Sequence, residues 1–525
     1  MRDFQLPGRS PVLATEGMVA TSHPLAARLA VETLVRGGTA ADAAVAGAVL
    51  LGLCEPQMTG LGGDCFALVK PAGSEAVEAL NGSGRAPAGA DAAALRDRGL
   101  DAVPVGGADA VTLPGAVDGF CRLLERHGRL GLADVLGPVI PYFERGVPVA
   151  PRVAFDWALA RDVPQGAARD VFLPGGTPPE PGALFALPGQ ADVLRRVARE
   201  GRAGFYEGPV AEDMVAALQG AGGAHAMDDF AAVEADWGTP LRGDYRGTEL
   251  IEHPPNGQGA TAILLANILS RFDLAAMDPF GADRVHLEAE ATKLAYDARN
   301  RFVSDAGTMT RLDHMMSQDT ADRLAALIDP GRAMPAPAAL SEQVHRDTIY
   351  ITAVDRDGMA VSLIYSIFHS FGSGLASDRF GILFQNRGSG FTLEPGHPNE
   401  LAPGRRPMHT IIPGMLGADG RVTMPFGVMG GAYQATGHAR FLSNVVDFGM
   451  DPQAAIDAPR AFAEKGVLKV ERGYSDAVRA ELAGLGHAVE VPEIAIGGAQ
   501  AIRIHGSGVL EGASDPRKDG CALGY

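Results

Sequence analysis

Thr348 is the residue whose place in the chain offers the most specific chemistry. It opens an apolar, β-branched run, Ile349–Val354, which ends in the turn Asp355–Gly358. If the peptide bond before Thr348 were cut, this residue would carry both a hydroxyl nucleophile and a free α-amine. Because an α-amine has a pKa of about 7.7–8.0, it can act as a general base at neutral pH. The alternative is that Thr348 is an ordinary β-branched residue of a strand.

A glycine-rich turn could supply a second part of such a site. The segment Gly427-Val428-Met429-Gly430-Gly431 follows an apolar stretch and precedes a helical pattern that starts near Ala432. Backbone N–H groups of consecutive glycines at a helix start can stabilise a developing oxyanion. The alternative is a tight strand-to-helix turn that needs glycine only for its backbone conformation.

Basic residues lie in or beside several glycine-rich loops: Arg85, Arg387, Arg405, Arg406 and His409. Such groups could hold a substrate carboxylate, which an arginine can bind with two parallel hydrogen bonds. The alternative is structural ion pairing, since the formal net charge of the chain is −18.

Other motifs with known chemistry are missing from the sequence. It has no G-x-x-x-x-G-K-[ST] phosphate loop and no G-x-S-x-G nucleophile elbow. His286, Glu288 and Glu290 lack the H-E-x-x-H spacing, so we expect them to be solvated or paired residues of a helix. The cysteines are scattered without a C-x-x-C pair, which argues against a disulfide framework or a zinc site.

Composition narrows the class of partner. The net charge of −18 and the lack of a long Lys/Arg cluster argue against nucleic acid and against an anionic membrane. The first residues show no basic segment followed by an apolar one, and no apolar stretch is long enough to span a bilayer. We therefore expect a soluble, cytoplasmic protein.

The pattern of elements predicts a layered α/β fold. Helices are expected over residues 24–35 and 42–53 and over most of 110–330, and strands dominate from about residue 346. The later strands are expected at 349–354, 360–367, 381–385, 410–413, 421–425, 468–471, 487–491 and 499–504, with helices at 433–448 and 452–458. The Ala/Pro/Gly-rich stretch 330–339 reads as a linker just ahead of Thr348, where a chain can be cut.

Short segments from about residue 15 to residue 525 resemble, in order, the γ-glutamyltransferase family of N-terminal-nucleophile hydrolases. They are Gly17–Ala26, Gly37–Ala43, Glu55-Pro56 with Gly60–Gly63, Phe205–Gly208, Tyr245–Gly247, Pro254–Gly257, Asp347-Thr348, Phe371–Gly374, Arg406-Pro407, Gly430-Gly431 and Asp515–Gly520. Each piece is weak, but the ordered series is specific.

The resemblance implies a four-layer αββα fold made as a proenzyme. The chain would cut itself between Asp347 and Thr348, giving a large subunit, 1–347, and a small subunit, 348–525, that together form one αββα unit. Thr348 would be the nucleophile and its own amine the base. Gly430 and Gly431 match the oxyanion pair of the family, and Ser366 matches a hydroxyl residue close to the nucleophile.

The chain departs from the family where the family binds the amino-acid part of a glutamyl group. Ser83 stands in place of the Arg that binds the α-carboxylate, Phe368 in place of an Asn, Gly390 in place of the Asp that holds the α-amino group, Arg387 in place of a Gln, and His409-Thr410 in place of paired serines. These changes remove most of that clamp. Arg85, Arg387, His409 and Thr410 are instead predicted to bind an anionic acyl group.

We therefore expect a self-processing N-terminal-threonine amidohydrolase or acyltransferase that works through an acyl-enzyme. A γ-glutamyl amide such as glutathione is the family default, a small amide such as oxamate is the alternative substrate, and a non-catalytic binding protein is the alternative of another class. No metal or organic cofactor is expected. The expected partners are the small amide and the two subunits of the chain itself, and a homo-oligomer of such pairs stays open.

Overall fold

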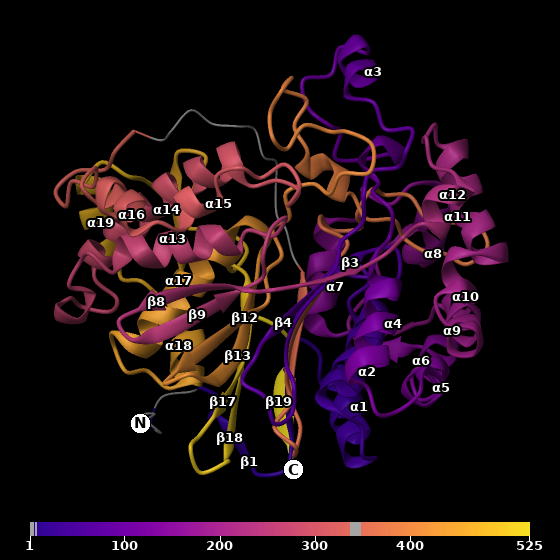
Figure 1. The fold of residues 1–525 in the computed structure, drawn as a ribbon, viewed down its shortest axis with the longest axis horizontal. Coiled ribbons are helices and arrows are strands. Elements are labelled where there is room, and N and C mark those ends of the chain that lie inside the picture. The colour runs from indigo at the N-terminus through magenta and orange to yellow at the C-terminus, as the bar shows by residue number, and fades with distance from the viewer. Residues whose placement is uncertain (1–4, 6–7, 336–347) are drawn as a thin grey trace.

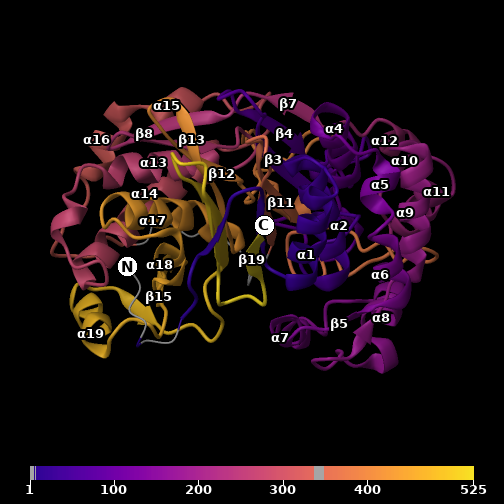
Figure 2. The same cartoon turned by 90° about the horizontal axis from the view of Figure 1, so that it is seen from below.

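Two antiparallel sheets face each other at the centre of the protein (Figures 1 and 2). The computed structural model describes residues 5, 8–335 and 348–525. The first sheet has the order β1 (Val12–Ala14), β18 (Leu510–Ser514), β17 (Gly498–Ile504), β13 (Arg421–Met429), β12 (Gly414–Ala418), β9 (Thr248–Glu252), β8 (Leu241–Tyr245). The second has the order β19 (Cys521–Gly524), β2 (Met18–Thr21), β10 (Ile349–Val354), β11 (Ala360–Ser366), β3 (Asp64–Lys70), β4 (Glu78–Gly82), β7 (Asp236–Gly238).

Helices cover the outer face of each sheet, so the molecule has four layers (Figure 1). The helices beside the second sheet are α1 (Pro24–Val35), α2 (Ala40–Cys54), α4 (Ala116–His127), α5 (Leu132–Leu136), α6 (Ile140–Arg145), α7 (Pro151–Leu159), α8 (Gly166–Phe172), α9 (Pro188–Glu200), α10 (Ala203–Tyr206), α11 (Gly208–Gly220) and α12 (Met227–Ala231), with α3 (Ala92–Asp97) projecting at the top of Figure 1. Those beside the first sheet are α13 (Gly259–Leu269), α14 (Ala282–Phe302), α15 (Leu312–Met316), α16 (Gln318–Ala325), α17 (Gln434–Val446), α18 (Pro452–Asp457) and α19 (Asp476–Gly484). Small sheets are formed by β14 (Ala461–Glu464), β15 (Val467–Val470) and β16 (Ala488–Glu490), and by β5 (Val147–Pro148) with β6 (Leu184–Phe185).

Strand β10 starts directly after Thr348. It lies between one strand that precedes Thr348 in the sequence and one that follows it. It pairs with β2 on one side and with β11 on the other. Helix α2 packs on β10, and the small residues of α2 allow this close contact. A Cβ added at Gly47 would lie 2.4 Å from the side chain of Ile351. The start of α2 is fixed by a capping box between Thr39 and Asp42.

The two sheets meet through apolar side chains at their facing surfaces. Near Thr348 this contact includes Phe66, Tyr350, Ile411 and Met429. Gly427 of β13 faces the ring of Tyr350, and an added Cβ would lie 2.3 Å from a ring carbon. The lack of a side chain at Gly427 therefore lets the first sheet approach β10 where the nucleophile candidate sits.

The predicted layered αββα fold is confirmed, whereas two predicted strands are wrong. Residues 381–385 form a loop with isolated bridges, such as Gly62 with Phe384, and residues 410–413 form a loop that follows the isolated bridge of Gly257 with His409. Their buried polar side chains, including Gln385 and Thr410, bond to other loops and replace a regular ladder. The segment Asp515–Gly520 joins β18 to β19. None of the helices in the described part of the chain combines the length and apolar character needed to cross a bilayer.

Candidate active site

Thr348 is buried immediately before β10, at one end of the second sheet. The strand register pairs Ile349 with Tyr365, which brings Thr348 opposite Ser366, the last residue of β11. The Oγ1 atom of Thr348 lies 3.2 Å from Oγ of Ser366. The N–H of Phe368 donates to Ser366 Oγ at 2.9 Å and holds that hydroxyl in place. The sheet register therefore assembles the two hydroxyl groups that the family resemblance implied.

The glycine turn lies between β13 and α17. Gly430 and Gly431 have φ angles of +117° and +56°, which favour glycine. A Cβ on Gly430 would lie 2.9 Å from the Cα of Gly497. The carbonyl of Gly430 accepts from the N–H of Tyr433 at 3.1 Å inside the first helical turn. Because a peptide unit is planar and trans, the N–H of Gly431 points the opposite way, out from the helix start. The turn thus needs glycine for its backbone and also presents an N–H suited to an oxyanion.

Residues from the helical layer hold this turn. The side-chain amide of Gln258 donates to the carbonyl of Gly431 at 3.2 Å and to that of Thr410 at 2.6 Å. Arg299 donates to the Gln258 carbonyl oxygen at 3.1 Å, and the hydroxyl of Tyr296 donates to the carbonyl of the residue after Gly431. Gln258 therefore ties the glycine turn to the loop that carries Thr410.

Arg387 and Thr410 lie together on loops at the same end of the sheets. The Arg387 guanidinium is fully buried and lies over the ring of Phe368, 3.8 Å from its centroid. It also donates to Oγ1 of Thr410 at 3.1 Å. Since Phe368 bonds to Ser366 and Thr410 is tied to Gly431, this pair bridges the hydroxyl side and the glycine side of the site.

Asp64 is the carboxylate of the site, and the sequence analysis gave it no role. One of its oxygens accepts from the N–H of Gly84 and from Gln385, while the other faces Nε2 of His409 at 3.1 Å and Nε of Arg387 at 3.7 Å. Burial raises the pKa of Asp64 to about 6, against the opposing effect of Arg387 and of its hydrogen-bond donors. The network therefore places beside Arg387 a carboxylate that takes up a proton more readily than an exposed aspartate does.

His409 and Arg85, both predicted to bind the acyl group, make contacts within the protein. Burial is the main cause, and the charge of Arg387 the second, that lowers the pKa of His409 well below its usual value, so the ring is neutral. Its Nε2 faces Asp64 and its Nδ1 accepts from the N–H of Ile411, so both nitrogens are engaged within the protein. The Arg85 side chain is 43% exposed and pairs with Asp236 at 3.2 Å and Asp305 at 3.6 Å. For Arg85 the structure favours the alternative of structural ion pairing.

A cavity of about 290 Å³ opens beside the glycine turn. Its lining includes Gly430, Tyr433, Met58 and His369. The carbonyl of Met58 accepts from the N–H of Ile367, the residue after Ser366, at 3.1 Å. The cavity therefore has the glycine turn on one wall and the segment that follows Ser366 on another.

Several residues that shape this region gave no signal in the sequence. Asp64 stands at the end of a glycine-rich loop, Gln258 follows the Pro254–Gly257 segment, and Asn386 lies next to Arg387. Asn386 accepts from the N–H of His369 at 3.0 Å and donates to the carbonyl of Val105 at 2.8 Å. Each acts on loops distant in the sequence, so only the folded chain reveals its partners.

Comparisons with known proteins agree with this geometry. A model of the gamma-glutamyltranspeptidase family matches residues 26–525. The chain is 37% identical to the glutathione hydrolase-like YwrD proenzyme of Bacillus subtilis, over 98% of this chain and 99% of that one. It is 34% identical to the oxamate amidohydrolase proenzyme of Klebsiella pneumoniae, again over 98% and 99%. Among solved structures, cephalosporin acylase from Bacillus halodurans superposes with a TM-score of 0.93 at 36% identity, covering 100% of this chain and 99% of that one. The chain therefore belongs to the gamma-glutamyltranspeptidase family of self-processing, amide-cleaving enzymes.

Proposed function

We propose that the protein hydrolyses small amides whose acyl group carries a carboxylate and lacks the α-ammonium group of glutamate. The new N-terminus would be Thr348, released by cleavage after Asp347, which lies outside the described residues. This makes residues 1–347 and 348–525 the large and small subunits of one αββα unit. The interleaving of β10 between β2 and β11 would keep the two chains together after the cut.

Thr348 is proposed to perform both steps of the reaction. Its Oγ1 attacks the amide carbonyl, its α-amine takes the hydroxyl proton, and the proton passes to the leaving amine. The bond to the leaving nitrogen breaks as an ester to Thr348 forms. Water, or an amine acceptor, then attacks the ester with the same amine as base. Ser366, at 3.2 Å, is proposed to orient the Thr348 hydroxyl, and the Gly430 and Gly431 N–H groups to stabilise the oxyanion.

The observation that carries the substrate class is the buried guanidinium of Arg387 beside Phe368 and Thr410. The family resemblance implies that a Gln and an Asp near this place assist an α-ammonium group, yet here Arg387 and Gly390 stand there. A buried cation repels an ammonium group and attracts a carboxylate. Thr410 Oγ1 accepts from Arg387, and we propose that this hydroxyl donates its own proton to the same carboxylate.

The names of the relatives indicate which substrates should be compared. A glutathione hydrolase-like protein, an oxamate amidohydrolase and a cephalosporin acylase all match nearly the full length of the chain. The amide-cleaving chemistry that these relatives share does not indicate whether the acyl group is γ-glutamyl, oxamyl or larger. The residues around Arg387 favour an acyl group with a carboxylate and no amine.

A panel of primary amides tests the proposal. Ammonia release from the processed enzyme would be measured with oxamate, succinamate, glutaramate, glutamine and butyramide. Glutamine differs from glutaramate only by its α-ammonium group. Butyramide lacks the carboxylate and is the neutral control. We expect at least one of the three amine-free anionic amides to exceed both glutamine and butyramide in kcat/KM. Glutamine as the best substrate would refute the substrate assignment while leaving the nucleophile intact, and activity in Thr348→Ala would refute the nucleophile.

A further inference from the structure

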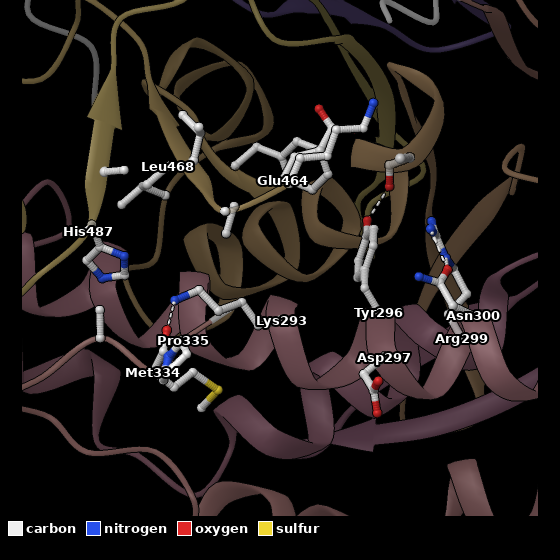
Figure 3. A pocket seen from close by; sticks show the side chains of 18 of the residues that line it. Lys293, Tyr296, Asp297, Arg299, Asn300, Met334, Pro335, Glu464, Leu468 and His487 are labelled. Carbon is white, nitrogen blue, oxygen red and sulfur yellow. Dashed lines mark hydrogen bonds between the residues drawn. The ribbon is translucent and has the colours of Figure 1, made fainter. Parts of the chain in front are cut away.

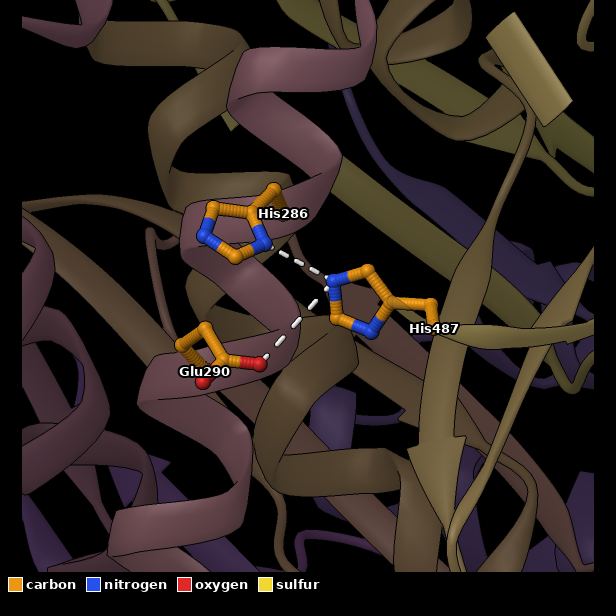
Figure 4. A group of neighbouring side chains, drawn as sticks. All are labelled: His286, Glu290 and His487. Atoms are coloured by element: carbon orange, nitrogen blue, oxygen red, sulfur yellow. Dashed lines mark hydrogen bonds and ion pairs between the residues drawn. The ribbon is translucent and has the colours of Figure 1, made fainter. Parts of the chain in front are cut away.

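Three buried residues with metal-binding side chains meet between helix α14 and the segment that joins α19 to β16. His286 and Glu290 lie one helical turn apart on α14, so they share a face of the helix. His487 reaches them from the segment between α19 and β16 (Figure 4). His286, Glu288 and Glu290 were predicted to be solvated or paired; in the structure all three are buried, Glu288 pairs with Arg284 and Arg440, and Glu290 pairs with Lys293.

The spacing of the three potential ligand atoms suits one ion. Nδ1 of His286 lies 2.8 Å from Nε2 of His487, and that Nε2 lies 3.9 Å from Oε1 of Glu290. All three atoms lie within 4.8 Å of one another. Two ligands bound at about 2.0–2.1 Å to a tetrahedral ion are roughly 3.4 Å apart, so small side-chain movements would bring the set around an ion.

The protein backbone already orients two of these side chains. Nε2 of His286 lies 2.8 Å from the carbonyl oxygen of Asp329. A carbonyl can only accept, so Nε2 carries the hydrogen and Nδ1 presents a lone pair toward His487 and Glu290. Oε2 of Glu290 accepts from the N–H of Met334 at 2.8 Å, which turns Oε1 toward the histidines. Outer partners of this kind fix ligand tautomer and direction in metal sites.

We propose that His286, Glu290 and His487 form a site for a divalent transition-metal ion, with Zn²⁺ the best match. Two imidazoles and one carboxylate are a ligand set that Zn²⁺ accepts, and they leave one coordination position open. That position would face a cavity of about 660 Å³ whose lining includes His487, Lys293 and Met334 (Figure 3). Water or a small anion could complete the coordination there.

Lys293 is the competitor for the ion. Its ammonium group lies 2.6 Å from Oε1 of Glu290 and also donates to the carbonyl of Met334 at 2.9 Å. In the metal-free protein it supplies the positive charge that the ion would otherwise provide. Because Lys293 lines the cavity, its side chain has room to swing away when the ion enters. Removing this amine should therefore strengthen metal binding, which is a consequence specific to this site.

The ion would join parts of the chain on both sides of Thr348. His286 and Glu290 precede it, and His487 follows it. If the chain is cut ahead of Thr348, as proposed above, the ion cross-links the large and small subunits. The metal site itself does not depend on the cut, because its residues are also together in the intact chain.

Titration calorimetry with ZnCl₂ on tag-free protein stripped with a chelator tests the proposal, and Co²⁺ provides a visible absorption signal from the ligand field. We expect one Zn²⁺ per chain in the wild type and equally in Thr348→Ala, which separates the site from processing. His487→Ala and Glu290→Gln should each weaken binding by more than the ~10–100-fold typical of losing an outer partner. His505→Ala is the matched control, because His505 also pairs with a carboxylate, Glu511, at 2.9 Å but is partly exposed; it should bind like the wild type.

The affinity of Lys293→Met for Zn²⁺ is a further test, because it would not change if the histidines had only a structural role. We expect Zn²⁺ to bind at least about tenfold more tightly to this variant, since the ion no longer displaces an ion pair. Unchanged or weaker binding in Lys293→Met, wild-type affinity in His487→Ala, or no Zn²⁺ bound by the wild type would overturn the assignment. In the processed enzyme, Zn²⁺ should also raise the denaturant concentration at which the two subunits separate, and His487→Ala should abolish that increase.

Discussion

Arg387→Gln is expected to change which acyl groups the enzyme accepts without removing its nucleophile. The guanidinium is fully buried, so water screens it little, and the proposed contact with a substrate carboxylate would be strong. A hydrogen bond to a charged group contributes about 1.5–3 kcal/mol. Since about 1.36 kcal/mol corresponds to a tenfold change in rate, kcat/KM for an anionic acyl group should fall by about 10- to 150-fold.

The assay compares three anilides that share a leaving group. Glutaryl-p-nitroanilide carries the carboxylate, acetyl-p-nitroanilide lacks it, and γ-glutamyl-p-nitroanilide adds the α-ammonium group. We expect weak turnover of the γ-glutamyl compound by the wild type, and we expect Arg387→Gln to reduce the glutaryl compound while leaving the acetyl compound within a few fold. Arg387→Lys, which keeps the charge but loses the planar fork, should lie between the wild type and the Gln variant.

A structural role for Arg387 would give a different pattern. Because Arg387 lies on Phe368 and beside Asp64, its loss could loosen the loops near Ser366. In that event all three anilides would slow by the same factor. An equal loss on the acetyl and glutaryl compounds, or robust γ-glutamyl turnover by the wild type, would refute the proposed recognition of a carboxylate by Arg387.

Three further changes test the rest of the site. Thr348→Ala should leave a single full-length band on a denaturing gel and no hydrolysis, because the hydroxyl that is the proposed nucleophile is lost; two bands in this variant would contradict the assigned cut. Gly430→Ala should lower kcat by about 10²–10³-fold in processed protein, because a Cβ would lie 2.9 Å from the Cα of Gly497 and the φ angle is +117°; circular dichroism checks the fold, and unchanged kcat would argue against an oxyanion role. The pKa of Asp64 is raised to about 6, so its proton is bound more tightly in the folded protein, and protonation at lower pH removes the negative charge of Asp64 beside Arg387. The kcat/KM ratio of the glutaryl to the acetyl anilide should therefore rise as pH falls through about 6, and a ratio independent of pH, or the same rise in Asp64→Asn, would count against this coupling.

The layered fold was largely accessible from the sequence because its helices and strands carry strong local patterns. The helix at 24–35 has the predicted bounds, and strand β10 covers 349–354 as expected. The strands predicted at 381–385 and 410–413 are wrong because the apolar residues of these segments resemble those of strands. The hydrogen bonds of their polar residues are instead made by contacts across loops. Periodicity records which side chains are apolar, and it carries no information on which backbone will lie alongside.

For the site, sequence could name residues but not their distances. Thr348, Ser366, Gly430 and Gly431 came from one motif and an ordered family resemblance, and Thr348 meets Ser366 through the register of β10 and β11. Arg85 and Arg387 looked alike in sequence, yet one pairs with carboxylates at the surface and the other is buried against Phe368. Their difference depends on burial, which only the packed loops determine.

The sequence by itself determined the type of chemistry, because a threonine that can become an N-terminus carries its nucleophile and its base on one residue. Only the tertiary structure decided which basic group lies beside that chemistry and which side chains form a second cluster. Arg387, Thr410 and Asp64 come together at one end of the sheets, and His286, Glu290 and His487 at another place. The physical reason is that hydrogen bonding and charge act over a few ångströms of space, and folding brings residues that are hundreds of positions apart within that range.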